Sequence, residues 1–487
     1  MNGNETMPDP VAVAGGLARR DFLERSANGC GLLALACLLR DQGLLAAEPA
    51  APHNPLAPRP PHFAPKATSI IWLHMHGAPS SVDLFDPKPE LDRRHGTTMN
   101  LGDNIGGFFA NNGTVMRSPF KFSRHGQCGH WFSEVLPNVA KHADDIAFLK
   151  GMHVQSNNHG PALYEINTGL TRVGFPSVGS WVTYGLGSDN CDLPGFVIMP
   201  DPRGSIEGGP LNWGSGFLPG AFQGTPVRTG PQPILHLRPH GEVGQGRQRA
   251  QLDLVAAMNR RHAERNPGEA DLQARIESFE LAYRLQMAAP DALDISQETA
   301  ETHRLYGLDN PISKPYGSQL LLARRLVERG VRFVQIYSGP QDDRLRWDAH
   351  AHLESNHRNR GAETDVPVAG LLTDLKRRGM LDSTLVIWAG EFGRLPITQG
   401  ADGTGRDHNR NGFALWLAGA GIKGGTSHGA TDELGLHAVE GRTDVHDLHA
   451  TLLHLVGIDH KRLTYRHAGR DYRLTDVKGN VIRSILS

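Results

Sequence analysis

Carboxylates and histidines follow apolar runs at several places in this 487-residue chain. In "STLVIWAGEFGRLPITQ", the apolar run at 385–388 is followed by Glu391, which stands between Gly390 and Gly393. Flanking glycines let a ligand or a backbone segment approach closely, so Glu391 is a candidate ligand at the end of a buried strand. The alternative is a structural carboxylate that pairs with Arg394 or caps a neighbouring helix.

Further Asp and His residues follow other apolar runs. The run "VRFVQIYSG" is followed by "WDAHAH", and "GTGRDHNRNG" precedes the run "GFALWLAGAG". Aspartate, glutamate and histidine are ligands for zinc, manganese or iron, although charged clusters more often form a solvated surface. The candidate metal ligands are Asp348, His350, His352, Glu391, Asp407 and His408, and the other candidate site residues are His76, Asp83, Asp447 and His449.

Alternating segment types predict the elements that position these residues. The apolar runs "SIIWLHM", "DIAFLKGMHV", "VRFVQIYSG" and "STLVIWAG" are typical of buried parallel strands. "GPALYEINTG", "YGSQLLLARRLVERG", "VPVAGLLTDLKRRGM" and "VHDLHATLLHLVGI" are typical of helices. The alternation predicts an α/β fold with a mostly parallel sheet, whose ligands bind at the carboxyl ends of the strands. The segment at about 200–310 fits this plan less well, and we expect an insertion or cap there.

The N-terminal segment has the features of an export signal. Arg19 and Arg20 precede a short apolar stretch at 31–39, which predicts a Tat-type signal over residues 1–48 and a periplasmic or cell-envelope location. The alternatives are an amphipathic helix or a lipid anchor at Cys37. Residues 49–66 are predicted to be a Pro-rich linker, and 67–487 the folded domain. We expect no transmembrane span in the mature chain, because the apolar stretch is too short.

The composition of the chain bears on which classes of function are expected. The net charge of -1 disfavours a nucleic-acid binder, which would carry a basic surplus. The 25 histidines favour metal binding or acid–base chemistry. Beyond the signal only Cys128 and Cys191 remain, so at most one disulfide forms within the mature chain.

Several motifs in one order resemble a known family. "HGAPSSVDLFDPKP", "WDAH", "GEFGRLP", "GRDHN", "DLHATLLHLVGIDH" and "GRDYRLTDVKGNV" are similar to motifs of the DUF1501 proteins. These are exported, sulfatase-like members of the alkaline phosphatase superfamily. The resemblance implies an alkaline-phosphatase-like three-layer α/β/α sandwich with a mostly parallel central sheet and metal-binding loops at the strand ends.

The superfamily site matches this chain in part. Glu391 stands at the place of a metal-binding aspartate, but Phe392 replaces the histidine that usually follows it. The resemblance implies that His408 is the late histidine of the site. In sulfatases a formylglycine nucleophile stands nine residues before a Thr-Gly pair, and that place is His159 here, which excludes the formylglycine mechanism. His159 is therefore a candidate catalytic residue, as a phosphohistidine, as a ligand or as an anion-binding group.

Two functions follow from the resemblance and the residues. The first is an exported metal-dependent hydrolase of phosphate or sulfate esters, whose cofactor is a divalent metal: zinc, another transition metal such as manganese or iron, or calcium. The second is a catalytically degraded sulfatase-like protein that binds anionic or sulfated glycans. Either way the expected partner is a small-molecule or glycan ester rather than nucleic acid.

Overall fold

The computed structural model describes residues 56–102, 112–190, 192–230, 233–234, 245–266, 283–287, 290–399 and 403–487. The predicted export signal and the first residues of the predicted linker lie outside them. Pro55–Ser487 form one compact unit. The later part of the linker runs along this unit, because the backbone N–H groups of His62 and Lys66 donate to the carbonyl groups of Gly457 and Leu455. Within the described part of the chain, no helix has the length and apolar character needed to cross a membrane.

The centre of the unit is an eight-stranded sheet of order β14-β6-β13-β10-β1-β9-β7-β8. Its strands are β1 Ser69–Met75, β6 Ile146–Met152, β7 Phe196–Met199, β8 Thr225–Pro226, β9 Phe333–Ser338, β10 Thr384–Ala389, β13 Phe413–Ala418 and β14 Thr426–His428. Strand β1 pairs in parallel with β10 on one side and β9 on the other. Only β13 runs antiparallel to its neighbours, β10 and β6. The predicted mostly parallel sheet is confirmed.

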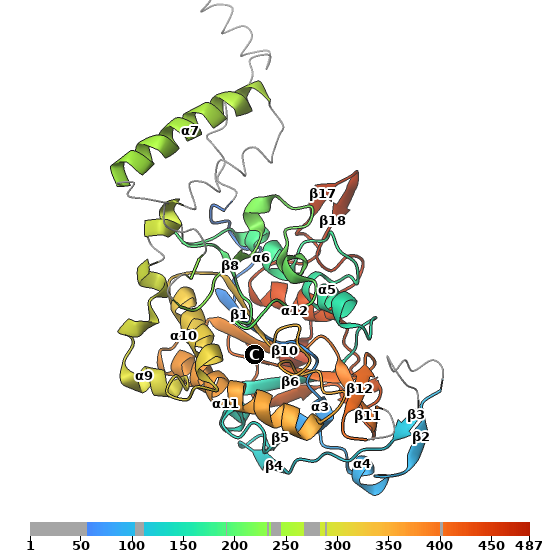
Figure 1. Ribbon diagram of the computed structural model, residues 1–487. Helices are drawn as coiled ribbons and strands as arrows, with labels where there is room; N and C mark the ends of the chain where they lie inside the picture. The colour runs from blue at the N-terminus through green and yellow to red at the C-terminus, as the bar shows by residue number, and fades with distance from the viewer. Residues whose placement is uncertain are drawn as a thin grey trace, which may run out of the picture. The chain divides into compact units, whose positions relative to one another are not determined.

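Helices cover both faces of this sheet. The described helices are α3 Ser81–Leu84, α4 Pro89–Arg93, α5 His159–Thr168, α6 Val178–Leu186, α7 Gln245–Arg265, α9 Ala300–Leu305, α10 Lys314–Glu328, α11 Leu353–Arg377 and α12 Val445–Leu455, with 3-10 turns η1 Val139–Asp145, η2 Gly209–Trp213, η3 Gly220–Phe222, η4 Ile295–Gln297 and η5 Arg483–Ile485. Successive strand residues point to opposite faces. In β1, Ile71 and Leu73 therefore join a core with α10 and α11, whereas Ile70 and Trp72 join a core with α5, α6 and α12. Figure 1 shows α10 and α11 on one side of the strands and α6 and α12 on the other, which confirms the three-layer α/β/α sandwich.

Two-stranded ribbons extend from the sandwich. They are β2 Thr98–Asn100 with β3 Asn112–Thr114, β4 Phe122–His125 with β5 His130–Ser133, β11 Gly393–Thr398 with β12 Arg406–Asn409, β15 Ala430–Thr431 with β16 Ala438–Glu440, and β17 Tyr465–His467 with β18 Arg470–Tyr472. The β11–β12 ribbon directly follows β10. The resemblance implied metal-binding loops at the strand ends, but Asp407 and His408 lie in β12, a short strand that pairs back on β11.

The segment at about 200–310 contributes in part to the sheet. Strand β8 pairs with β7 and forms one edge of the sheet. The same segment contains η2, η3, α7, η4 and α9. Residues 235–244 and 267–282 lie outside the described part of the chain. The idea of a cap over the sheet stays a prediction.

Candidate functional site

Three parallel strands in the middle of the sheet end at the same edge, and a candidate residue follows each one. His76 follows β1, Glu391 follows β10, and Asp348 lies in the connection from β9 to α11. The Trp347 N–H donates to the His76 carbonyl, so the β9 connection folds back onto the end of β1. Gly77 permits this approach, because its φ is +101° and a Cβ there would lie 2.6 Å from the backbone nitrogen of Asp348.

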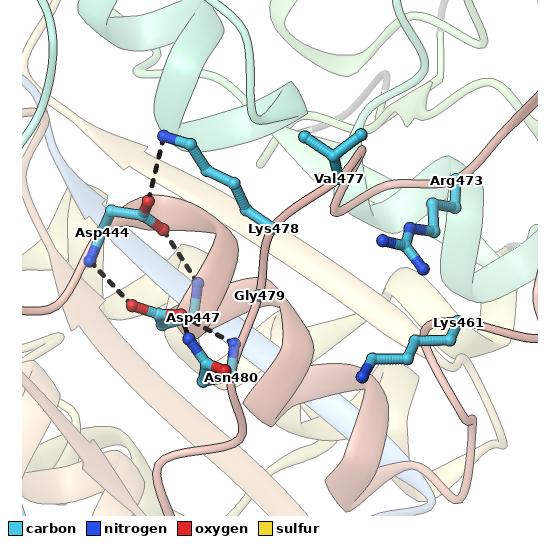
Figure 2. A pocket seen from close by; sticks show the side chains of 8 residues that line it. All are labelled: Asp444, Asp447, Lys461, Arg473, Val477, Lys478, Gly479 and Asn480. Atoms are coloured by element: carbon cyan, nitrogen blue, oxygen red, sulfur yellow. Dashed lines mark hydrogen bonds and ion pairs between the residues drawn. The ribbon is translucent and has the colours of Figure 1, made fainter.

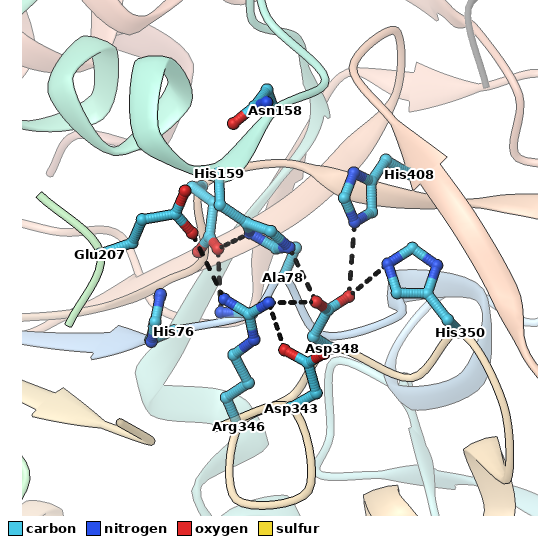
Figure 3. Close-up of polar contacts among 12 residues, drawn as sticks. His76, Ala78, Asn158, His159, Glu207, Asp343, Arg346, Asp348, His350 and His408 are labelled. Carbon is cyan, nitrogen blue, oxygen red and sulfur yellow. Dashed lines mark hydrogen bonds and ion pairs between the residues drawn. The ribbon is translucent and has the colours of Figure 1, made fainter. Parts of the chain in front are cut away.

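His159, Asp348, His350 and His408 form a group in which one ligand atom from each residue lies within 4.8 Å of the others. Figure 3 shows the three imidazole rings around the carboxyl group of Asp348. The Nε2 atoms of His350, His159 and His408 lie 2.9, 3.1 and 3.3 Å from its oxygens. The structure thus brings three of the predicted metal ligands together with His159, the first residue of α5 and the predicted catalytic residue.

The other ring nitrogens of two of these histidines face oxygen acceptors. Nδ1 of His408 lies 2.6 Å from the carbonyl oxygen of Asn157, and Nδ1 of His350 contacts the side-chain oxygen of Gln399. Amide oxygens accept hydrogen bonds, so Nδ1 carries the hydrogen in both rings. The Nε2 atom of each ring faces the carboxyl group of Asp348. Metal-binding histidines are oriented in this way by their outer hydrogen bonds.

His159 lies between two carboxylates. Its Nδ1 is 2.5 Å from Oε1 of Glu391, and its Nε2 is 3.1 Å from Oδ2 of Asp348. Burial alone would lower the pKa of His159, but hydrogen bonds to Asp348 and Glu391 raise it above its ordinary value. Burial lowers the pKa of His408 to about 3. A proton and a cation therefore compete for His159, whereas His408 is neutral at physiological pH.

Two arginines flank the carboxyl group of Asp348. Nη2 of Arg394 lies 2.5 Å from Oδ1, and Nη2 of Arg346 lies 2.7 Å from Oδ2. The Arg394 side chain also donates to the carbonyl groups of Gly77 and Ala78, which fixes it to the backbone after β1. Burial would raise the pKa of Asp348, but Arg394 and the three histidines hold it far below its ordinary value. Asp348 is therefore ionised at any working pH.

Glu391 lies behind His159, outside the group of four. It is fully buried, and its Oε2 lies 3.2 Å from Nε2 of His74. Burial would raise its pKa, but hydrogen bonds from His159 and His74 hold the pKa well below its ordinary value. A Cβ on Gly393 would lie 2.5 Å from the carbonyl oxygen of Gly412, so backbone packing accounts for this glycine. In this structure Glu391 orients His159 rather than joining the group as a ligand.

Three further predicted ligands or site residues are not members of the group. His352 is exposed at the N-cap of α11. Asp83 is buried and lies 2.8 Å from Nε of Arg406. Asp407 is buried next to the group, where its Oδ1 accepts a hydrogen bond from the backbone N–H of His408. Asp83 therefore ties α3 to β12, and Asp407, whose Oδ1 also lies 3.8 Å from Nδ1 of His350, borders the group without belonging to it.

Two predicted site residues belong to α12. Asp447 forms a capping box with Asp444 at the start of this helix. His449 is buried with Nε2 3.0 Å from the Ile166 carbonyl, and burial lowers its pKa to about 3. Both residues have structural partners away from the group of four.

His76 lies on the inner side of the site. Its ring centroid is 6.1 Å from that of His159, and its Nδ1 is 3.0 Å from the Gly339 carbonyl. Burial lowers the pKa of His76 to about 4, so the ring is neutral and Nδ1 carries its hydrogen. Nε2 is a buried acceptor without a hydrogen-bond partner among the described residues. Figure 3 shows His76 beside Arg346.

Sequence reasoning missed several supporting residues. They are His74, Asn157, Arg346 and Gln399, which contact the group or Glu391. A histidine inside the apolar run "SIIWLHM" was an available signal, since a buried polar group needs a partner. Asn157 acts through its carbonyl group, which any residue type supplies, so no side-chain pattern marks it.

A buried carboxylate holds the loop that precedes α5. Glu165 is 2% exposed, and both its oxygens accept from the backbone N–H of Gln155, at 3.1 and 2.9 Å. The same loop carries Asn157, which faces His408, and Asn158, which caps α5. Burial raises the pKa of Glu165 to about 7. Glu165 therefore supports the group from its own helix without touching it.

The group of four fits a divalent transition metal. Three imidazoles and one carboxylate suit zinc, manganese or iron, whereas calcium prefers an all-oxygen shell. Bonds of about 2.0–2.2 Å put two ligand atoms at most about 4.4 Å apart. The spread of up to 4.8 Å in the structure is wider than this by about 0.4 Å, so the ligand atoms would have to move inward by that amount. The residues present could thus hold one such ion.

Comparison with known proteins places the chain in a family. A family model described as "Protein of unknown function (DUF1501)" matches residues 67–486. The chain belongs to the DUF1501 family. No curated protein matches this DUF1501 sequence.

Solved structures resemble this DUF1501 protein only distantly. A phosphonate monoester hydrolase from Silicibacter pomeroyi is 13% identical, with 66% of this chain and 68% of that chain covered and a TM-score of 0.34. A sulfatase from Pseudoalteromonas sp. is 14% identical, with 88% and 70% covered and a TM-score of 0.33. An alkaline phosphatase from the Antarctic bacterium TAB5 is 12% identical, with 75% and 94% covered and a TM-score of 0.32. At these scores the likeness carries no argument about activity.

Replacing Glu391 by glutamine is expected to weaken metal binding about 10- to 100-fold, the usual cost of losing a partner that orients a metal-binding histidine. Glutamine keeps the size of the side chain, but it has only one oxygen that can accept a hydrogen bond. It therefore cannot accept hydrogen bonds from both His159 and His74 as the carboxylate does. Competition with a chelating dye measures the affinity. Glu433→Gln, at an exposed position, is the matched control. An unchanged affinity in Glu391→Gln would show that Glu391 does not support the group.

Proposed function

We propose that this DUF1501 protein is a metal-dependent hydrolase of phosphate or sulfate esters. The observation that carries the proposal is the convergence of three imidazole Nε2 atoms on one ionised carboxylate at the carboxyl edge of a parallel sheet. That edge is where open α/β folds bind their ligands. His159, Asp348, His350 and His408 would hold the ion, with zinc, manganese or iron as the metal.

A divalent cation bound there would supply Lewis-acid polarisation of the ester oxygen and a water of lowered pKa. Arg346 is the protein group placed to bind the anionic part of the ester. Its Nη2 contacts Asp348 at 2.7 Å, and its Nη1 is only loosely held by Glu207 at 3.5 Å. A substrate oxyanion would take the place of Glu207 on Nη1, because a charge-assisted hydrogen bond at normal distance is stronger.

Water is the proposed nucleophile. Both ring nitrogens of His159 face carboxylates, and Nε2 is needed to hold the ion, so His159 has no free lone pair for covalent attack. His76 presents an unprotonated Nε2 and would accept a hydrogen bond from the attacking water. In the reaction the water oxygen bonds to phosphorus or sulfur, the bond to the alcohol oxygen breaks, and the proton passes to the leaving alcohol.

The test combines metal content with ester hydrolysis. We expect about one transition-metal ion per chain by elemental analysis, and hydrolysis of 4-nitrophenyl phosphate, bis(4-nitrophenyl) phosphate or 4-nitrophenyl sulfate. His408→Ala is expected to lose the metal and at least about 100-fold in kcat/KM, because one of four ligands is gone. His352→Ala changes an exposed histidine close by in the sequence and is the matched control. A metal-loaded chain that cleaves none of these esters would contradict the proposal and favour the glycan-binding alternative.

A further inference from the structure

A second polar pocket lies beside the start of α12. It has a volume of about 480 Å³ and is lined by Asp444, Asp447, Lys461, Arg473, Val477, Lys478, Gly479 and Asn480. This volume is within the range of ligand pockets. None of its lining residues belongs to the group of four around Asp348.

The two carboxylates of the pocket are already engaged. Asp444 accepts from the backbone N–H groups at the start of α12, and its Oδ2 lies 3.3 Å from Nζ of Lys478. Asp447 accepts from the backbone N–H of Asn480 at 2.7 Å and from the N–H of Asp444. These bonds complete a helix cap, and neither carboxylate forms an ion pair with Arg473 or Lys461 among the described residues.

Two cations of the pocket have no acidic partner among the described residues. Arg473 donates only through Nε, to the carbonyl oxygen of Asp476, and the Lys461 side chain forms no ion pair within the described part of the chain. Figure 2 shows the guanidinium group of Arg473 and the ammonium group of Lys461 directed into the same space. Burial and the positive charges of Arg473 and Lys461 lower the pKa of His460, and the negative charges of Asp459 and Asp447 oppose this shift in part.

The positive charges of Arg473 and Lys461 repel each other across the pocket, and an anion bound between them would offset this repulsion. We infer that this pocket is an anion-binding site, and that Arg473 and Lys461 hold a sulfate or phosphate group there. A guanidinium fork matches two oxygens of a tetrahedral oxyanion, and an ammonium group contributes a third contact.

The pocket and the group of four are linked by a short stretch of chain. Thr443, next to Asp444, forms a bridge with Met152 at the end of β6. His159 lies seven residues after Met152, so an extended chain would span at most about 25 Å between them. The anion site does not depend on the proposed function, because none of its residues belongs to the group of four.

Calorimetric titration of the chelator-treated full chain with sodium sulfate and with sodium phosphate tests the site. We expect one saturable anion per chain, and binding at least 10-fold weaker in the double variant Arg473→Gln/Lys461→Gln. Arg117→Gln/Lys121→Gln, a pair of exposed basic residues, is the matched control. If the double variant is unstable, the single variant Lys461→Gln is titrated instead. It leaves the hydrogen bond from Arg473 to the Asp476 carbonyl intact.

The outcomes separate this site from the proposed function. Hydrolysis of small 4-nitrophenyl esters should be unchanged in the double variant, because its two residues lie outside the group of four. Preferential binding of phosphate or of sulfate would identify the anion. Equal binding by wild type and the double variant, or no binding by the wild-type chain, would overturn the site whatever the esterase result.

Discussion

Asp348→Asn is expected to abolish metal binding and to lower the free energy of unfolding by about 3–5 kcal/mol. The carboxylate is buried between Arg394 and Arg346, and asparagine leaves two buried guanidinium groups without their shared counter-charge. The same change removes the one anionic group around which the three histidines converge. Chemical denaturation in the presence of a chelator measures the stability effect separately from the metal.

The matched control for Asp348→Asn is Asp343→Asn. Asp343 lies 2.5 Å from the same Nη2 of Arg346, but its side chain is 71% exposed. Exposed ion pairs contribute about 1 kcal/mol or less, so this variant should keep its metal and nearly all its stability. Full metal content in Asp348→Asn would refute the central role given to this carboxylate.

Glu165→Gln is expected to remove a pH dependence of stability worth about 3 kcal/mol. Burial raises the pKa of Glu165 from 4.5 to about 7 in the folded chain, with a smaller opposing effect of His446 and a small further rise from Asp444. Each pKa unit corresponds to about 1.36 kcal/mol. Below pH 4.5 both states hold the proton. As the pH rises towards 7, the unfolded chain releases it first, so the folded state loses stability.

Urea unfolding at pH 5, 6, 7 and 8 checks this sign. The stability of the wild-type chain relative to Glu165→Gln should fall as the pH rises and level off above about pH 7. Glu354→Gln, at an exposed position on α11, should show a constant difference from wild type. A constant difference for Glu165→Gln as well would mean that Glu165 titrates at its ordinary pKa.

The sheet could be predicted because its central strands form short apolar runs in the sequence. In "SIIWLHM" and "STLVIWAG" the residues at 70–73 and 385–389 are apolar at consecutive positions, as expected for a strand that is buried on both faces. Asp348 and His350 could be placed at the edge where the parallel strands end, whereas His408 precedes a strand and was proposed from the family resemblance. The ribbon β11–β12 was missed, because short polar strands such as Arg406–Asn409 carry no apolar periodicity.

The sequence alone does not tell which of Glu391 and His159 is a ligand and which is a supporting residue. Both are ligand types that stand at element ends, and the pattern says nothing about which of them is nearer the centre. The geometry puts Nε2 of His159 next to Asp348 and leaves Glu391 2.5 Å from Nδ1, on the far side of the ring. Whether His159 or Glu391 is nearer to Asp348 depends on where α5 begins relative to the end of β10. That position is set by tertiary packing.

The spacing of the group along the chain bears on when a metal can be captured during synthesis. His159, Asp348 and His408 are far apart in sequence, and they meet only after β9 and β10 have paired with β1. A nascent chain that ends before β12 has at most three of the four ligands and lacks the ribbon that presents His408. If the proposed metal site is correct, the complete set of ligands would therefore be available only late in synthesis. A bound ion would then stabilise the finished sheet by about 4 kcal/mol when its free concentration is about 1,000 times the Kd.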